Sequence, residues 1–382
     1  MKIISISWLN NAFFGGVERR AHEFSIVANN YHEVSFYAIK TPWSKKSANN
    51  DYNENDIFLP VNPYRFGLKY FWETFFLKRV TKKLKKKNHN NTIVHGQGVN
   101  GYPGVANGLP TVICMHGAEN DYNRKGKIGT MWRETIDKCD HIFSISENVR
   151  ERLVKIGVDA KKITTVYNGI DIKKFQNVTK TDIEKVFKKF SLNQKTKYIL
   201  SVHNLINEKR TKEMLDVFLS VQEKFLDREL LICGDGYNRA VLERYSRSKK
   251  IRVRFLGRLN DKDLLPIYRL SDVFVLNSSK EGLPISIGEA MASKCALVVG
   301  NVGSIGEILK NNVNSLLNDR CDDEAFRKNL IRVLSDNVLR EKISERACSD
   351  SFELSWENQF TKINKVYNDI SLKKSFRTSV DG

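Results

Sequence analysis

The feature that most constrains the fold is a repeated alternation of short apolar runs with longer, polar stretches of helical pattern. In the first half of the chain we predict strands at residues 3–8, 34–39, 93–95, 111–115, 141–145 and 163–167. The second half restarts the rhythm, with predicted strands at 198–202, 230–233, 253–256, 273–276, 297–299 and 315–317. Strands that alternate with helices form parallel sheets. The sequence therefore predicts an α/β protein with one parallel sheet in each half.

The chain length supports a division into two domains, because 382 residues exceed the size at which one hydrophobic core usually stops growing. We expect an N-terminal domain at residues 1–172 and a C-terminal domain at 198–355. The charged stretch 173–197 between them is predicted as a connecting helix and linker. An amphipathic segment at 356–370 is predicted as a final helix, and residues 371–382 as a frayed tail.

Composition narrows the class of protein. The six cysteines show no Cys-x-x-Cys spacing, which argues against a disulfide framework and a zinc site and favours a reducing cytoplasm. No targeting segment is evident, and no apolar run approaches the roughly 18 residues of a membrane-spanning helix, so we expect a soluble or peripheral protein. The net charge of +19 favours a polyanionic partner: an anionic membrane, a nucleic acid or a phosphorylated substrate.

Two carboxylates mark a candidate ligand site. Glu281 and Glu289 lie eight positions apart, just after the predicted strand 273–276. Pro284 suits the first position of a helix, so Glu281 should lie in a strand-to-helix loop and Glu289 about one and a half turns into the helix. Loops at the carboxyl ends of parallel strands bind ligands, helix starts hold anions, and carboxylates accept hydrogen bonds from hydroxyls. A nucleotide sugar has both a phosphate and several hydroxyls.

Several motifs occur in the order found in one known family. They are Gly15-Gly16-Val17-Glu18, His116-Gly117, Ser144-Ile145-Ser146-Glu147, Val166-Tyr167-Asn168-Gly169-Ile170-Asp171, Gly234-Asp235-Gly236, Phe255-Leu256-Gly257, Ser271-Asp272-Val273-Phe274, the paired glutamates and Val302-Gly303-Ser304-Ile305-Gly306-Glu307. With them, residues 1–365 resemble the retaining family 4 glycosyltransferases (glycosyl transferases group 1). The resemblance implies a GT-B fold: two Rossmann-like domains facing across a cleft that holds the active site. The N-terminal domain would bind the acceptor, the C-terminal domain the nucleotide sugar, and the last helix would cross back to the N-terminal domain.

The resemblance also implies roles for the residues of the donor site. Glu289 would accept hydrogen bonds from the ribose, and Glu281 would contact hydroxyls of the transferred sugar. The backbone N–H groups of Gly282 and Leu283 would add donors. Lys209 matches the lysine that neutralises charge on the leaving diphosphate. For each residue a structural role is the alternative, such as a helix-surface acid for Glu289.

The chain departs from the family pattern near this lysine. His203 and Asn204 stand where the family has a Gly-Arg pair, and Arg210 stands where it has a glycine. Neutral Asn204 is a weaker contact for a diphosphate than arginine. We predict that Arg210 compensates by binding the donor from the other side.

Two further elements complete the predicted site. Gly15 and Gly16 allow the backbone to approach a phosphate, although a plain turn would also use them. By resemblance, His116 faces the reacting sugar and binds a hydroxyl or positions the acceptor. We thus assign His116, Glu281 and Lys209 to catalysis. No metal-ligand cluster is recognised, so no metal and no cofactor are expected.

A basic segment at residues 64–87 suggests contact with a membrane. Its apolar residues recur at helical spacing: Leu68, Phe71, Trp72, Phe75, Phe76, Val80 and Leu84. Basic side chains dominate the rest, and we assign these to membrane contact: Lys78, Arg79, Lys82, Lys83, Lys85, Lys86 and Lys87. An aromatic face opposite lysines is typical of a helix that lies on an anionic membrane. The alternative is a helix that packs into the core and exposes a solvated basic face.

The hypothesis is a retaining, metal-independent hexosyltransferase that moves a sugar from a UDP- or GDP-linked donor to a glycan or lipid-linked acceptor. By association with the family, polysaccharide or lipopolysaccharide assembly on the inner face of a bacterial membrane is expected. A nucleotide-sugar epimerase of the same fold is one alternative. A non-catalytic homologue that binds membrane or nucleic acid is another, although no nucleic-acid-binding signature is present and no such partner is expected.

Overall fold

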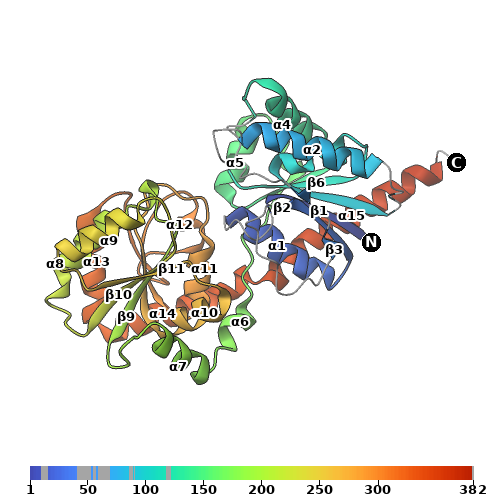
Figure 1. Cartoon of the computed structure of the whole chain (residues 1–382). Coiled ribbons are helices and arrows are strands. Elements are labelled where there is room, and N and C mark those ends of the chain that lie inside the picture. The colour runs from blue at the N-terminus through green and yellow to red at the C-terminus, as the bar shows by residue number, and fades with distance from the viewer. Residues whose placement is uncertain are drawn as a thin grey trace. The chain divides into compact units, whose positions relative to one another are not determined.

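The computed structural model describes residues 1–9, 16–40, 53–54, 57–58, 69–85, 89, 91–117 and 122–380. The chain forms two compact units: unit 1 is Met1–Gly169 with Trp356–Gly382, and unit 2 is Ile170–Ser355. In each unit, helices flank a sheet whose strand pairs are parallel (Figure 1). The predicted α/β class, with one parallel sheet in each half, is confirmed.

Unit 1 is built on the sheet order β3-β2-β1-β5-β6-β7-β8, with β4 also paired to β2. Its strands are β1 (Lys2–Leu9), β2 (Glu33–Lys40), β3 (Asn53–Glu54), β4 (Ile57–Phe58), β5 (Thr92–Gln97), β6 (Thr111–Met115), β7 (His141–Ser144) and β8 (Ile163–Thr165). Its α-helices are α1 (Gly16–Asn29), α2 (Lys69–Lys85), α3 (Tyr102–Val105), α4 (Gly126–Lys138), α5 (Glu147–Lys155) and α15 (Trp356–Val380). Every residue of β5 and β6 is buried, as expected for parallel strands covered on both faces.

Unit 2 has the sheet order β11-β10-β9-β12-β13-β14. Its strands are β9 (Lys197–Val202), β10 (Arg228–Cys233), β11 (Val253–Gly257), β12 (Ser271–Leu276), β13 (Ala296–Gly300) and β14 (Leu316–Asn318). Its α-helices are α6 (Ile172–Gln176), α7 (Lys180–Lys189), α8 (Thr211–Gln222), α9 (Arg239–Ser248), α10 (Asp261–Leu270), α11 (Ile285–Ala292), α12 (Ile305–Ile308), α13 (Asp323–Ser335) and α14 (Asn337–Ser351). This order matches the doubly wound arrangement of dinucleotide-binding folds.

The stretch 173–197, expected as a helix and linker, belongs to unit 2. It contains most of α6 and all of α7, and both helices pack against α10. Thr179 and Asp182 form a capping box at the start of α7, and Lys189 at its end binds Asp263 at 2.7 Å. Packing against α10 therefore makes this segment a part of the unit.

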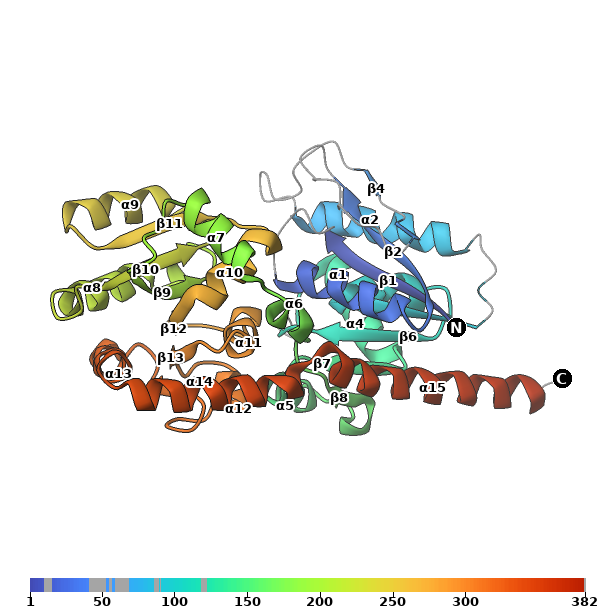
Figure 2. The ribbon, with the colours of Figure 1, turned by 90° about the horizontal axis from the view of Figure 1, so that it is seen from below.

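The last helix, α15, belongs to unit 1, as predicted for a C-terminal helix that crosses back. Trp356, Phe360, Ile363 and Tyr367 are buried in the core of unit 1. The helix continues to Val380, so residues 371–380, expected as a frayed tail, are helical (Figure 2).

Helix α2 buries most of the apolar side chains that were predicted to face a membrane. Phe76, Val80 and Leu84 are fully buried in the core of unit 1, and Trp72 and Phe75 pack against the same core. Phe71 is 61% exposed. The basic side chains that the structure describes are exposed: Lys78, Arg79, Lys82, Lys83 and Lys85. Lys86 and Lys87 lie outside the described residues. The core-packing alternative thus accounts for most of the apolar stripe.

Across the part of the chain that the structure describes, no helix combines the length and the apolar character needed to cross a lipid bilayer.

Candidate active site

The strand order of unit 2 places two loops side by side where ligands usually bind. From β9 the sheet continues in one direction through β10 and β11 and in the other through β12, β13 and β14. Open α/β sheets bind ligands outside the carboxyl ends of the strands at such a reversal of order. The lysine loop, residues 203–210, follows β9, and the glutamate loop, residues 277–284, follows β12.

The structure brings two of the predicted catalytic residues into contact. Nζ of Lys209 lies 2.5 Å from Oε1 of Glu281, and the two side chains are only 17% and 7% exposed. The loops also meet through their backbones, because the N–H of Ser279 donates to the carbonyl of Glu208 at 2.8 Å. The ammonium group of Lys209, which could bind a diphosphate, therefore lies next to the carboxylate of Glu281, which could accept hydrogen bonds from hydroxyls. Each could exchange its present partner for part of a ligand.

His203 is the first residue of the lysine loop, and both of its ring nitrogens are hydrogen-bonded. The hydroxyl of Ser201 donates to the carbonyl of Val275, so it accepts from Nδ1–H of His203 at 3.3 Å. Nε2 of His203 then accepts from the hydroxyl of Thr211, 2.9 Å away, at the start of α8. Burial, together with the charge of Lys209, lowers the pKa of His203 to about 3. His203 is thus a buried, neutral side chain that links β9 to the start of α8. Asn204 beside it is exposed.

The glutamate loop is fixed on its other side by the residues after β13. The N–H of Ser304 donates to the carbonyl of Gly282 at 3.0 Å, and Leu283 is buried. Gly303 has φ +63°, and a Cβ there would meet the carbonyl oxygen of Glu281 at 2.1 Å. Only glycine fits such a backbone approach. Pro284, predicted as the first helical residue, precedes α11 as its N-cap.

Glu289 lies in α11 and is 2% exposed. One of its oxygens accepts a hydrogen bond from the hydroxyl of Tyr268 at 2.8 Å, and Tyr268 itself is fully buried. A buried carboxylate needs such partners. A ribose hydroxyl bound at Glu289 would share this carboxylate with Tyr268.

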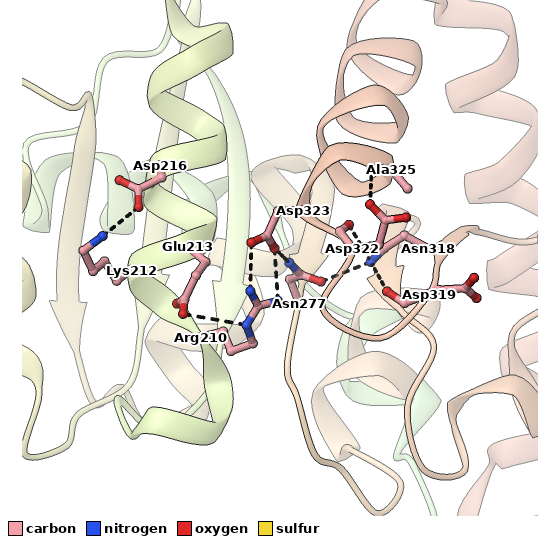
Figure 3. Close-up of polar contacts among 10 residues, drawn as sticks. All are labelled: Arg210, Lys212, Glu213, Asp216, Asn277, Asn318, Asp319, Asp322, Asp323 and Ala325. Carbon is pink, nitrogen blue, oxygen red and sulfur yellow. Dashed lines mark hydrogen bonds and ion pairs between the residues drawn. The ribbon is translucent and has the colours of Figure 1, made fainter.

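Arg210, predicted to bind the donor, is engaged elsewhere. Its guanidinium makes two hydrogen bonds to Asp323, at 3.0 and 2.8 Å, and lies 3.7 Å from Glu213 (Figure 3). This bidentate pair uses the geometry that a diphosphate would otherwise use. Local sequence did not reveal this partner, because Asp323 is 113 positions away.

In unit 1, His116 follows β6 and contacts Gln97 at the end of β5, with Nε2 2.7 Å from the amide oxygen. Burial lowers the pKa of His116 well below its ordinary value, and the charges of Arg20 and His95 lower it further. The imidazole is therefore neutral, with Nε2–H donating to Gln97 and Nδ1 left as an acceptor. Gly16 is the exposed first residue of α1, and Gly15 lies outside the described residues.

Sequence reasoning missed a buried cation whose charge acts on this histidine. Arg20 is 4% exposed and contacts Sγ of Cys114 and the carbonyl of Val166. The other buried residues of α1 are Ala21, Phe24, Ser25 and Ala28. Arg20 falls on the same stripe at helical spacing, and that periodicity could have identified it.

Within the described ranges, no group of three or more His, Cys, Asp or Glu side chains is arranged to hold a metal ion. The chain has one Asp-x-Asp sequence, Asp261-Lys262-Asp263, in the first turn of α10. Its carboxylates pair with lysines of unit 2: Asp261 with Lys174 at 3.5 Å and Asp263 with Lys189 at 2.7 Å.

Comparison with known proteins covers both units. The family described as Glycosyltransferase Family 4 matches residues 14–174, and Glycosyl transferases group 1 matches residues 182–350. The uncharacterized glycosyltransferase MJ1607 of Methanocaldococcus jannaschii is 29% identical over 61% of this chain and 60% of its own length. The UDP-Gal:α-D-GlcNAc-diphosphoundecaprenol α-1,3-galactosyltransferase of Escherichia coli is 26% identical over 77% of this chain and 79% of its own length.

Among solved structures, Anabaena Alr3699/HepE in complex with UDP and glucose superposes with a TM-score of 0.77. The match covers 97% of this chain and 100% of that one at 14% sequence identity, so it supports the fold alone. Together, the matches to both family models, the relatives and the shared fold show that the chain belongs among the family 4-like glycosyltransferases with the GT-B fold.

Proposed function

We propose that the chain is a retaining hexosyltransferase that moves a sugar from a nucleoside-diphosphate sugar to a glycan or lipid-linked acceptor, without a metal ion. The observation that supports this most is the contact of Lys209 with Glu281 at the carboxyl ends of β9 and β12. Lys209 would bind the diphosphate, and Glu281 would accept hydrogen bonds from the sugar.

Donor binding in this proposal is an exchange of partners. Lys209 leaves Glu281 and neutralises the negative charge that builds on the departing nucleoside diphosphate. Glu281, released from the lysine, accepts hydrogen bonds from sugar hydroxyls, and the N–H groups of Gly282 and Leu283 add donors. Both side chains are largely shielded from water, which strengthens each of these interactions.

Transfer with retention requires the acceptor to approach from the face that the diphosphate leaves. We propose that the departing phosphate takes the acceptor's proton, while the protein orients the reactants and stabilises charge. His116 would contribute as a neutral hydrogen-bond acceptor through Nδ1, because its pKa lies well below the ordinary value. No protein residue is assigned as a covalent nucleophile.

The comparisons favour a UDP-linked hexose and a lipid-linked acceptor as first candidates. The Escherichia coli relative is named for a UDP-Gal donor and a diphosphoundecaprenol-linked acceptor, and the Anabaena structure contains UDP and glucose. Lipid-linked acceptors place such an enzyme at a membrane surface. We propose that the exposed basic face of α2 contacts anionic lipids on the inner face of the membrane, in polysaccharide or lipopolysaccharide assembly.

The test is product analysis with UDP-galactose, UDP-glucose, UDP-N-acetylglucosamine and GDP-mannose, each offered with a lipid-linked monosaccharide acceptor. NMR coupling constants of the anomeric proton give the configuration of the new bond. An α-linked product from an α-linked donor is expected. A β-linked product would contradict retention, and a changed sugar still attached to its nucleotide would identify an epimerase.

A further inference from the structure

The carboxylate of Asp323 joins the two loops of the proposed donor site. Asp323 is the first residue of α13. Its Oδ1 accepts from Nη1 of Arg210 at 3.0 Å and from Nδ2 of Asn277 at 2.7 Å, and its Oδ2 accepts from Nη2 of Arg210 at 2.8 Å (Figure 3). Arg210 ends the lysine loop, and Asn277 begins the glutamate loop.

On the side of the lysine loop, Arg210 directly follows Lys209 and has φ +47°, in the left-handed region. That conformation is unfavourable for any residue with a Cβ, and glycine is its ordinary occupant. Arg210 keeps it while its side chain, 13% exposed, binds Asp323 in bidentate fashion. The direction in which the backbone leaves Lys209 is therefore tied to α13.

On the side of the glutamate loop, Asn277 is fully buried directly after β12 and four positions before Glu281. Its side-chain oxygen accepts from Nδ2 of Asn318 at 3.2 Å. Asn318 ends β14, and its amide also reaches the carbonyl of Asp322, which caps α13 through the N–H of Ala325. Asp323 is thus part of a set of hydrogen bonds that connects the ends of β12 and β14 to the start of α13.

We propose that Asp323 is a positioning residue for sugar transfer, which fixes the lysine loop and the glutamate loop so that Lys209 and Glu281 meet. This inference rests on the function proposed above and names the residue that sets the geometry of its donor site. Arg210 acts through Asp323 and does not bind the diphosphate. The opposite reading, in which Arg210 is a diphosphate ligand, makes different predictions for the same variants.

The activity test compares Arg210→Gly, Arg210→Lys, Asp323→Asn and the double variant Arg210→Gly with Asp323→Asn. We expect each single variant to lower kcat/KM for the nucleotide sugar by about 10- to 100-fold, because small misplacements of reacting groups have effects of that size. Lysine should not rescue Arg210, because it lacks the bidentate fork. The double variant should have a kcat/KM no lower than that of either single variant, because all three proteins lose the same contact between Arg210 and Asp323.

UDP affinity, measured by calorimetry, separates the two readings. If Arg210 were a diphosphate ligand, Asp323→Asn would free the guanidinium of Arg210 and would strengthen or preserve UDP binding. Arg210→Gly would then weaken UDP binding. If Asp323 positions the loops, both variants weaken UDP binding to a similar extent. Opposite effects would overturn the proposal, as would additive losses in the double variant.

The same helix offers matched controls. Glu324, the neighbour of Asp323, is bound by the fork of Arg327 at 2.8 and 2.7 Å, and this exposed pair does not reach either loop. Glu324→Gln removes the same charge from the same turn of α13, and Arg327→Lys removes the same kind of fork. Both controls should leave kcat/KM and UDP affinity unchanged. Arg210→Gly also guards against misfolding, because it relieves a left-handed conformation while it removes the contact.

A ligand-free measurement keeps the inference distinct from the proposed function. Acylation of Lys209 by a lysine-reactive ester, followed by peptide mass spectrometry, reports whether Lys209 is still paired with Glu281. The rate should rise in Arg210→Gly and Asp323→Asn, as in Glu281→Gln, and stay unchanged in Glu324→Gln. Unchanged rates in the first two would overturn the positioning role. If the wild type bound no nucleotide, the proposed function would fail, and the labelling would still decide whether Asp323 holds the pair.

Discussion

At the scale of single residues, the contact between Lys209 and Glu281 explains how a site can be preorganised without a ligand. Two loops from different strands deliver opposite charges to within 2.5 Å, in a place where both side chains are mostly shielded from water. The pair holds each side chain near the position that the proposed chemistry requires. The pair also competes with the ligand, because each partner must be released before it binds the donor.

This competition predicts opposite effects for Glu281→Gln. Binding of UDP alone should be preserved or strengthened, because Lys209 no longer has to leave a carboxylate. Turnover of the nucleotide sugar should fall about 100-fold, the size of effect seen when one preorganised polar contact is removed from an active site. Calorimetry with UDP and a transfer assay measure the two quantities. Glu208→Gln, at an exposed position one residue before Lys209, is the control. A parallel loss of UDP binding and turnover in Glu281→Gln would contradict the exchange of partners.

His203 predicts a pH dependence of stability. Its pKa is about 3 in the folded chain against an ordinary value of 6.5. Between these values the unfolded chain binds a proton that the folded chain does not, so stability is full above about pH 6.5 and falls as the pH drops toward 3. The slope reaches about 1.4 kcal/mol per pH unit.

Denaturant unfolding from pH 7 to pH 5 tests this prediction. His203→Gln retains hydrogen-bonding atoms but does not titrate, so the wild type should lose more free energy of unfolding than the variant as the pH falls. Parallel curves for the two proteins would show that His203 is not buried as a neutral side chain.

At the scale of secondary-structure elements, α2 and α15 show how the core determines which face of a helix remains available. The apolar stripe of α2 is mostly buried inside unit 1, which leaves its basic side chains and Phe71 exposed. Membrane contact through α2 would therefore be mainly electrostatic and would weaken as the salt concentration rises.

Neutralising Lys82, Lys83 and Lys85 to glutamine should weaken binding to anionic phospholipid vesicles by about 100-fold at low salt, from about 1 kcal/mol for each lysine near the surface. Folding should be unaffected, because all three side chains are exposed. Vesicle sedimentation measures the effect. The exposed lysines Lys138, Lys155 and Lys161 provide a control set in the same unit. An equal loss in both sets would argue for a diffuse charge effect without a specific role for α2.

Helix α15 predicts a different outcome for two substitutions along its length. Phe360 is 3% exposed in the core of unit 1 and stacks on Tyr31 with ring centroids 4.9 Å apart. Phe360→Ala should lower the free energy of unfolding by about 3–5 kcal/mol. Leu372 is 58% exposed, and Leu372→Ala should change it by less than about 0.5 kcal/mol.

Hydrogen exchange of β1 and β2 measures the local consequence of these substitutions. Faster exchange in Phe360→Ala alone is expected. If the amides of these strands stayed protected in Phe360→Ala, the helix would not support the core as described.

At the scale of the whole molecule, sequence patterns predicted the parts that depend on local burial. Runs such as 111–115 and 273–276 read as strands because strands of a parallel sheet are buried on both faces. The position of Glu281 after β12 followed from the same pattern. The pattern of α2 predicted a helix with an apolar stripe, but a stripe does not tell whether core or lipid covers it.

The remaining features depend on residues that are distant in sequence. Arg210 finds Asp323 across 113 positions, and His203 is braced by Ser201 and Thr211 only after the loop has folded. The stretch 173–197 reads as a linker because it is polar, and only its contact with α10 makes it part of unit 2. Contacts of this kind produce no periodic pattern in the local sequence, so they could not be predicted from it.

The role proposed for Lys209 is to bind the diphosphate of a nucleotide sugar. Its most direct test is isothermal titration of the wild type, Lys209→Ala and Lys212→Ala with UDP, GDP and ADP. Lys212 pairs with Asp216 on the exposed side of α8 and serves as the matched control (Figure 3). We predict that one nucleotide binds the wild type and Lys212→Ala alike and binds Lys209→Ala at least about tenfold more weakly, the loss of a charge-assisted contact. Equal affinity in Lys209→Ala, or no binding of any nucleotide to the wild type at millimolar concentration, would contradict this role.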